Sequence, residues 1–361
     1  NTRAHSGSVT PTAGVGGLGS LPRRGGECAV SHCGRSGDDV TGHGRSRLWK
    51  PGILGVPADL QGDYLVSDSS VFRSAVPLEW HVNGLKLAGL SWGDPSGRPL
   101  LALHGWLDNA ASFSQLAPLL TDFYVVAVDL TGHGQSARRS ADASYQIWDD
   151  LPEILGILKA LGWNTFDLVG HSRGAIIATL LASAYPERVR HLVLLDAVTP
   201  QPVAEGAFPL QMRKALEDKP RLHNRANRVF ACLEEAVASR TRNGLSESAA
   251  KQLVERNLHA CSGGMTWTTD PRLQGASAVK LTEAQIRAVL GALDMPTLLM
   301  RAGDTAHQAS KYIESVQRSI DNLVVYTIKG GHHFHMESGV GEVAQHMEHF
   351  LSETNKTESA L

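Results

Sequence analysis

Residues 166–181 read FDLVGHSRGAIIATLL. The apolar run at 166–169 predicts a short buried strand, and residues 174–181 predict the start of a helix. Ser172 therefore lies in a tight strand-to-helix turn, in the pattern Gly-x-Ser-x-Gly. Such a turn exposes the serine hydroxyl, and the N-terminus of the following helix favours negative charge beside it. We predict that Ser172 is a nucleophile; the alternative is a structural turn built from small residues.

The strand–helix pattern of residues 166–181 recurs along the chain. Other short apolar runs lie at 100–103, 124–128, 192–195, 297–300 and 323–328. Segments with helical period lie between or after them, at 111–120, 146–161, 174–185, 309–318 and 339–352. Buried strands that alternate with helices are typical of a parallel sheet with crossover helices. The expected fold class is therefore α/β, with a mostly parallel central sheet and flanking helices.

The regular part of the chain begins with a predicted hairpin. Residues 78–82 and 85–90 flank Asn83-Gly84, a pair typical of a tight β-turn. Residues 1–75, in contrast, are rich in Gly, Ser, Arg and Thr and show no apolar period. Such a segment buries too little apolar surface to offset its chain entropy. We expect residues 1–75 to be a disordered or non-native N-terminal segment.

The alternation of predicted strands and helices stops between the two halves of the expected core, which spans residues 76–196 and 293–355. Residues 197–292 keep a helical period and are too long for a loop. We expect them to form a helical cap. It is expected over the carboxyl edge of the sheet, because ligands of α/β proteins bind there.

The composition argues against several classes of function. Of the 361 residues, 42% are hydrophobic and 19% are charged, and the formal net charge is −2. This balance argues against general binding to nucleic acid or to an anionic membrane. No apolar run approaches the roughly 20 residues of a membrane span, and the first residues lack the pattern of a secretory signal. Four scattered cysteines do not indicate a disulfide framework, so a reduced, cytoplasmic protein is expected.

A second stretch with chemical meaning is LALHGWLDN at 101–109, which leaves a predicted strand. The backbone amide of Trp106, together with that of Arg173 after the nucleophile, is expected to bind a substrate oxyanion. The side chain of His104 is expected only to pack the loop. Asp129 opens the turn DLTGHGQS at 129–136 and is expected to stabilise that turn.

The third stretch, GGHHFHME at 330–337, follows the last predicted strand. A histidine between this strand and the final helix can reach the Ser172 hydroxyl as a general base. His332, directly after the two glycines, is the first choice. His333 is the second candidate for the base, and His335 is expected to pack or to cap the final helix.

Two carboxylates compete to orient His332 through its other ring nitrogen. Asp304 follows the predicted strand at 297–300, where such an acid is expected, although it comes early in the register. Asp196 ends the preceding strand at 192–195. Each also has an alternative role as a loop cap, and the sequence leaves the choice between them open.

Neither group of metal-ligating residue types matches a known metal pattern. Cys28 and Cys33, with His32 and His43 nearby, do not fit a zinc spacing well. The histidines at 332, 333 and 335 lack an accompanying cluster of carboxylates or cysteines. We expect no metal site at either place.

Together these stretches resemble the α/β-hydrolase superfamily and, within it, the serine hydrolase-like proteins. The resemblance covers roughly residues 77–352, is weakest in the cap, and rests on LHGWLDNAASF (103–113), DLTGHGQS (129–136), LGWNTFDLVGHSRGA (161–175), HLVLLDAVTP (191–200) and GGHHFHMES (330–338). It implies Ser172 as nucleophile and His332 as base, without a metal or organic cofactor. That group also lacks a clean acid after the penultimate strand, which favours Asp196 somewhat.

The expected function is hydrolysis of an ester-type bond in a small molecule. The bond is a carboxylic ester, thioester or lactone, and the reaction passes through an acyl-enzyme on Ser172. The serine argues against epoxide hydrolases and haloalkane dehalogenases of this fold, which use aspartate at this position. Two alternatives stay open: a non-catalytic ligand-binding homologue, and a cofactor-free haloperoxidase-like or C–C hydrolase activity on the same residues.

Overall fold

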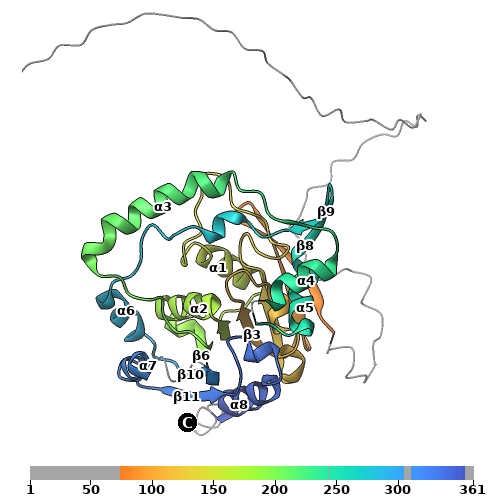
Figure 1. The fold of residues 1–361 in the computed structure, drawn as a ribbon. Coiled ribbons are helices and arrows are strands. Elements are labelled where there is room, and N and C mark those ends of the chain that lie inside the picture. Colours follow the sequence, from red (N-terminus) through yellow and green to blue (C-terminus); the bar gives the residue numbers. More distant parts are fainter. Residues whose placement is uncertain (1–73, 243, 305–309, 354–361) are drawn as a thin grey trace, which may run out of the picture. The chain divides into compact units, whose positions relative to one another are not determined.

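The computed structural model describes residues 74–242, 244–304 and 310–353. Its centre is an eight-stranded sheet with the strand order β1-β2-β4-β3-β5-β6-β10-β11 (Figure 1). The strands are β1 (Val76–Val82), β2 (Leu85–Trp92), β3 (Arg98–Leu103), β4 (Phe123–Val128), β5 (Phe166–His171), β6 (Val189–Leu195), β10 (Thr297–Ala302) and β11 (Leu323–Ile328). Only the pairs β1–β2 and β2–β4 are antiparallel. The other neighbours are parallel, which confirms the expected α/β class.

The predicted hairpin forms the antiparallel edge. Asn83 and Gly84 both have positive φ angles, 51° and 78°, as a two-residue hairpin turn of this kind requires. Val82 pairs with Leu85 directly across the turn. Residues 1–75 were expected to be a disordered or non-native segment. Of these, residues 1–73 lie outside the described residues.

Helices cover both faces of the sheet because alternate strand residues point to opposite sides. Leu101 and Leu103 pack in one core cluster, which also contains residues of α1 (Leu151–Ala160), α2 (Arg173–Ala184), α6 (Glu283–Leu290) and α7 (Ser310–Gln317). Leu100 and Ala102 pack in the other, with α8 (Val340–Glu353). The central strands are therefore buried on both faces, as their continuous apolar runs predict.

The helix expected at 111–120 does not form. This segment contains two short 3₁₀ turns, η3 (Ala110–Phe113) and η4 (Ala117–Leu119). Pro118 cannot donate a backbone hydrogen bond, and Asn109 instead caps η3 by accepting from the amide of Ala111. The apolar residues of the segment still pack on the sheet, so periodicity identified the buried face but not the type of helix.

Residues 197–292, the expected cap, contain helices α3 (Phe208–His223), α4 (Leu233–Thr241) and α5 (Glu247–Asn257). It also contains a small antiparallel sheet in the order β7-β9-β8, made of β7 (Val229–Phe230), β8 (Leu258–Cys261) and β9 (Gly264–Trp267). A helical cap was the expectation, and the sequence did not predict this small sheet. Figure 1 shows α3 crossing the top of the view, above α1 and α2.

Residues of the expected cap, including Phe230, Val237 and Leu253, form a separate apolar cluster together with Met336. Ile286 and Leu290 of α6, however, belong to the core cluster of the sheet. Helix α6 therefore packs on the sheet although it lies within residues 197–292, and the extent of the cap stays a prediction. Further 3₁₀ turns are η5 (Pro186–Arg188), η6 (Glu205–Ala207), η7 (Pro271–Gln274) and η9 (Phe334–Met336). Among the described residues, no helix has the length and apolar character that crossing a membrane requires.

Candidate active site

Ser172 forms the sharp turn between β5 and α2. Its backbone has φ 51° and ψ −117°, a conformation that is strained for a residue with a Cβ atom. The amide of Ser172 donates to the carbonyl of Leu195, 2.9 Å away on the neighbouring strand β6. This contact holds the turn at the carboxyl edge of the sheet.

The glycines on both sides of Ser172 are required by close backbone contacts. A Cβ atom on Gly174 would lie 2.1 Å from the carbonyl oxygen of Leu103. A Cβ atom on Gly170 would lie 2.5 Å from the carbonyl oxygen of Gly174. Because Cβ atoms do not approach oxygen so closely, only glycine lets β5, α2 and β3 meet here. The local structure is thus the strand–turn–helix that the sequence predicts.

His332 lies beside Asp196, which follows the end of β6. Nδ1 of His332 donates to Oδ2 of Asp196 over 2.6 Å. Because the carboxylate accepts at Nδ1, the neutral ring carries its lone pair on Nε2, the form that a general base requires. The imidazole is 45% exposed, so Nε2 is accessible to a substrate.

Asp196 is itself fixed by two backbone contacts. Its Oδ1 accepts from the amide of Ala302 over 2.8 Å, and its own amide donates to the carbonyl of Met300 over 2.8 Å. The residue has φ 57°, which turns the chain sharply at the end of β6. Asp196 is therefore held between β6 and β10.

Asp304, the other candidate acid, is exposed. Its amide donates to the carbonyl of Gly330 over 3.2 Å, but within the described part of the chain no hydrogen bond joins its carboxylate to His332. Of the two candidate acids, the structure brings only Asp196 to His332. The described residues also contain no hydrogen bond between Ser172 and His332, a contact that often tightens only when substrate is bound.

The expected oxyanion loop follows β3. Leu107, directly after Trp106, has φ 61°, so the chain turns sharply here as well. The indole nitrogen of Trp106 donates to the carbonyl of Leu273 in η7 over 2.9 Å. Arg173 is the first residue of α2, where backbone amides have no partner within the helix. Its guanidinium points elsewhere and donates to the carbonyls of Tyr145 and Gln146, each 3.2 Å away.

His104 and Asp129 pack the neighbouring loops, as expected. His104 is fully buried; its Nδ1 donates to the Gly105 carbonyl over 2.7 Å, and its Nε2 accepts from the amide of Leu130 over 3.0 Å. Burial lowers the pKa of this imidazole. Asp129 is also fully buried and accepts from the amides of Ala110 and Gln135 over 2.7 and 2.8 Å.

Asp129 has one partner that the sequence did not predict. Arg256 of α5 reaches Asp129 across the boundary of cap and core, with Nη2 2.9 Å from Oδ2. Both side chains are nearly or fully buried. A second ion pair of this kind joins Arg240 of α4 to Asp108, over 2.5 Å. These two pairs attach the cap helices to the loops that follow β3 and β4.

Four histidine rings cluster under the candidate site. The ring of His171 is fully buried, and its centroid lies 4.7, 4.9 and 4.1 Å from those of His332, His333 and His335. Burial and the neighbouring histidines hold the pKa of His171 well below its ordinary value. The sequence alone indicated no role for His171, although it adjoins Ser172.

The two remaining histidines, His333 and His335, form hydrogen bonds with residues other than Asp196. His335 is buried and hydrogen-bonds the Ser112 hydroxyl over 2.8 Å, which fits the expected packing role. Burial, reinforced by His333, lowers the pKa of His335 to about 3. His333, the expected substitute for His332, donates from Nε2 to Oδ2 of Asp108 over 3.1 Å. His333 is therefore held by Asp108, whereas His332 is held by Asp196.

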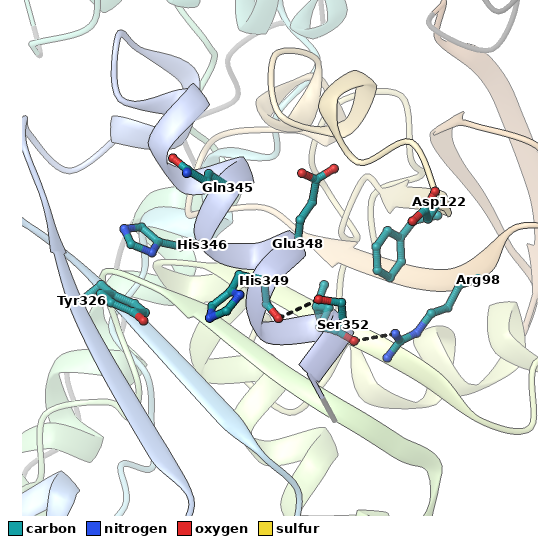
Figure 2. Close-up of a pocket in the computed structure, with 10 residues that line it drawn as sticks. Arg98, Asp122, Tyr326, Gln345, His346, Glu348, His349 and Ser352 are labelled. Carbon is teal, nitrogen blue, oxygen red and sulfur yellow. Dashed lines mark hydrogen bonds between the residues drawn. The ribbon is translucent and has the colours of Figure 1, made fainter. Parts of the chain in front are cut away.

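Two of the cavities among the described residues bear on where a substrate could bind. A cavity of about 290 Å³ is lined by residues 143–146 and by parts of α3 and residues 275–279. A larger one, of about 810 Å³, lies beside α8 (Figure 2), where Tyr326 stacks on His346. Arg98 and Phe123, which line the larger cavity, begin β3 and β4, whereas Ser172, Trp106 and Asp196 follow carboxyl ends of strands. The larger cavity is therefore not part of the candidate active site.

Comparison with known proteins agrees with the fold described above. The chain matches the family model described as the alpha/beta hydrolase fold over residues 98–339. It therefore belongs to the α/β-hydrolase superfamily. Within it, the chain belongs to the serine hydrolase-like group. It is 31% identical to a serine hydrolase-like protein of Danio rerio, over 75% of this chain and 85% of the relative.

Two further proteins are similar to this chain. A serine hydrolase-like protein of Dictyostelium discoideum is 29% identical over 74% of this chain and 79% of the relative. Among solved structures, a hypothetical protein from Pseudomonas aeruginosa PAO1 is similar, with a TM-score of 0.73 and 36% identity. That likeness covers 77% of this chain and 99% of the bacterial one.

Proposed function

We propose that this protein is a serine hydrolase that cleaves an ester-type bond of a small molecule through an acyl-enzyme on Ser172. The observation that carries the proposal is the contact between His332 and Asp196, at the same edge of the sheet as the strained turn at Ser172. Together they supply a nucleophile, a base and an orienting acid. The same residues suit a carboxylic ester, a thioester or a lactone.

In the acylation step, Nε2 of His332 takes the proton of the Ser172 hydroxyl while the serine oxygen attacks the substrate carbonyl. The oxygen of the tetrahedral intermediate is negatively charged, and the amides of Trp106 and Arg173 stabilise it. Loss of one such donor raises a barrier by about 3–4 kcal/mol in serine hydrolases. His332 then gives its proton to the departing oxygen or sulfur, and the acyl group stays on Ser172.

Deacylation reverses these roles. His332 takes a proton from a water molecule, and the resulting hydroxide equivalent attacks the acyl carbonyl. The intermediate collapses, Ser172 regains its proton from His332, and the carboxylic acid leaves. Asp196 stabilises the imidazolium in both steps and keeps its own charge.

The acyl chain of the substrate in this proposal occupies the cavity lined by α3 and residues 143–146, while its carbonyl lies outside that lining, at Ser172. The cavity's volume of about 290 Å³ lies near the lower end of the range typical of ligand sites. Tyr145 and Gln146 in its wall are held by the Arg173 side chain, next to Ser172. Leu216, Leu222 and Val279 give the wall apolar surface, which suits an acyl chain. The cytoplasmic location expected from the sequence stays a prediction.

A fluorophosphonate probe tests the proposed function, because it reacts only with an activated serine. We expect labelling of the wild type and none of Ser172→Ala. Ser183→Ala is the matched control, since Ser183 lies on the same helix α2 and only hydrogen-bonds a carbonyl within it. Folded wild type that is not labelled would support a non-catalytic ligand-binding protein instead.

Turnover of p-nitrophenyl esters of increasing chain length then tests the substrate class. We expect a chain-length optimum that is set by the cavity. A probe-reactive Ser172 without ester turnover would favour the C–C hydrolase or haloperoxidase-like alternative on the same residues.

A further inference from the structure

We propose that Asp108, His171 and His333 form a binding site for a divalent transition-metal ion such as Zn²⁺, and that an ion bound there inhibits the serine site. The inhibitory part rests on the function proposed above; the metal site itself does not. One carboxylate oxygen and two ring nitrogens of these residues lie within 4.8 Å of one another. Carboxylate oxygen and imidazole nitrogen are both ordinary zinc ligands.

The hydrogen bonds of His171 leave one ring nitrogen without a partner. Nε2 of His171 lies 2.9 Å from the carbonyl of His332, and a carbonyl only accepts, so Nε2 carries the proton. Within the described residues, Nδ1 is buried and has no hydrogen-bond partner. The whole ring is buried among the residues that the structure describes. Nδ1 therefore presents a bare lone pair.

This lone pair faces a carboxylate instead of a donor. Oδ2 of Asp108 lies 3.8 Å from Nδ1 of His171, so two acceptors face each other with no proton between them. A buried acceptor without a donor is costly, and a cation between the two atoms would remove that cost. The bond from Nε2 to a backbone carbonyl is also the arrangement that commonly orients a metal-binding histidine.

His333 supplies the third ligand. Its Nε2 is 3.1 Å from the same Oδ2 of Asp108. Ligands of a tetrahedral zinc ion lie about 3.3 Å apart when each bond is about 2.0–2.1 Å. His333 and Asp108 are already near this spacing, whereas His171, 3.8 Å from Oδ2 of Asp108, must move closer. On binding, the proton on Nε2 of His333 moves to Nδ1 or is released to water, and the freed nitrogen binds the ion. The side chain of His333 is 21% exposed, which gives the ion access from solvent.

Arg240 sets the affinity of this site. It occupies Oδ1 of Asp108 and leaves Oδ2 to the ion, but it places a positive charge beside the site. A divalent ion therefore competes with the attraction of Asp108 for Arg240. We expect Arg240→Gln to tighten metal binding because it removes this repulsion.

An ion at this position would act on the serine site through the backbone. His171 directly precedes Ser172, His333 directly follows His332, and Asp108 lies two residues after Trp106. A Cβ atom on Gly105 would lie 2.9 Å from Nδ1 of His171, so the site also borders the oxyanion loop. Drawing the three ligands together shifts all three catalytic segments at once, and displacements of this kind are costly to catalysis.

Titration with Co²⁺ tests the metal site without any substrate. Visible absorption bands report coordination, and equilibrium dialysis counts bound ions on the full chain. Because the chain has other cysteines and histidines, the readout is the difference between proteins. We expect Asp108→Asn and His333→Gln each to bind one ion fewer than the wild type. His259→Gln, at an exposed position on β8, is the matched control and keeps the wild-type count. Equal counts in all four proteins would overturn the proposal.

The rate of fluorophosphonate labelling, with EDTA or with Zn²⁺, tests inhibition. We expect Zn²⁺ to slow labelling of the wild type and of His259→Gln at least about tenfold, a loss typical of misplaced catalytic groups. The ratio between the two conditions, measured within each protein, should be near one in His333→Gln. Inhibition that persists in His333→Gln would overturn the inhibitory role. Absence of labelling in EDTA would instead contradict the proposed function, while the Co²⁺ count still decides the metal site.

Discussion

Oδ2 of Asp196 lies 2.6 Å from Nδ1 of His332, although 136 residues separate them in the sequence. The second oxygen of Asp196 accepts from the amide of Ala302 in β10, so the carboxylate is fixed by the neighbouring strand. The acid beside the histidine thus comes from the end of β6. In the described part of the loop after β10, the amide of Asp304 donates to the carbonyl of Gly330.

This geometry predicts different results for the two acids. Asp196→Asn should lower kcat about 10³–10⁴-fold, because an amide at this position no longer holds His332 in its base form. Asp304→Asn, the matched control, should stay within about twofold of the wild type, the range of a surface change without strain. Hydrolysis of a p-nitrophenyl ester measures both. A large loss in Asp304→Asn with little change in Asp196→Asn would reverse the assignment.

The sequence could predict the central sheet because its strands are buried on both faces. Continuous apolar runs such as 192–195 indicate this burial directly, and β6 contains that run. The hairpin of β8 and β9 was missed because its strands are short and half-buried. Ser262-Gly263 between them was a turn signal that a search for hairpins would have found.

Local motifs predicted the candidate site where a residue's place follows from its own segment. Ser172 is such a residue, because the glycines beside it specify the turn. The choice between Asp196 and Asp304 depends instead on the positive φ angle at Asp196, which the sequence does not display. The ion pairs that Arg240 and Arg256 form with core aspartates span 132 and 127 residues, so local pattern could not reveal them.

The close approach at Gly174 predicts a large effect of one methyl group. Gly174→Ala places a Cβ atom 2.1 Å from the carbonyl of Leu103, so α2 must move away from β3. We expect a loss of about 1–3 kcal/mol in the free energy of unfolding, the usual effect of overpacking, together with loss of probe labelling. Urea denaturation measures the first. Gly206→Ala is the control, since no atom lies within 4 Å of its added Cβ. Equal stability of Gly174→Ala and wild type would show that the turn tolerates a side chain.

The pair of Arg256 and Asp129 predicts how firmly the cap is attached. Arg256→Met leaves the fully buried Asp129 without its cation, which should destabilise the protein by about 3–5 kcal/mol. Arg228→Met removes an ion pair with Glu235 in which both side chains are exposed, and it should cost at most about 1 kcal/mol. Urea denaturation of both variants gives the comparison. Equal losses would mean that the buried pair contributes no more than a surface one.

The buried His335 predicts a loss of stability in mild acid. Its pKa is about 3 in the folded protein, against an ordinary value of 6.5 when the chain unfolds. Between these two values the unfolded chain binds a proton at His335 and the folded protein does not. The stability that uncharged His335 contributes is therefore fully present above pH 6.5 and decreases as the pH falls toward 3. Asp108, whose pKa lies below its ordinary 3.8, loses its contribution only at lower pH. Between pH 5 and 6 the two effects are separable.

His335→Gln removes the titrating group and can keep a hydrogen bond to Ser112. We expect the plot of unfolding free energy against pH to be shallower in this variant by up to about 1.4 kcal/mol per pH unit. His171, His104 and His133, whose pKa values burial also lowers, stay in both proteins and leave a remaining slope. His259→Gln, at an exposed position, should retain the slope of the wild type. Urea denaturation at several pH values between 5 and 6 measures these slopes. Equal slopes in His335→Gln and wild type would mean that His335 is protonated in the folded protein as readily as in the unfolded chain.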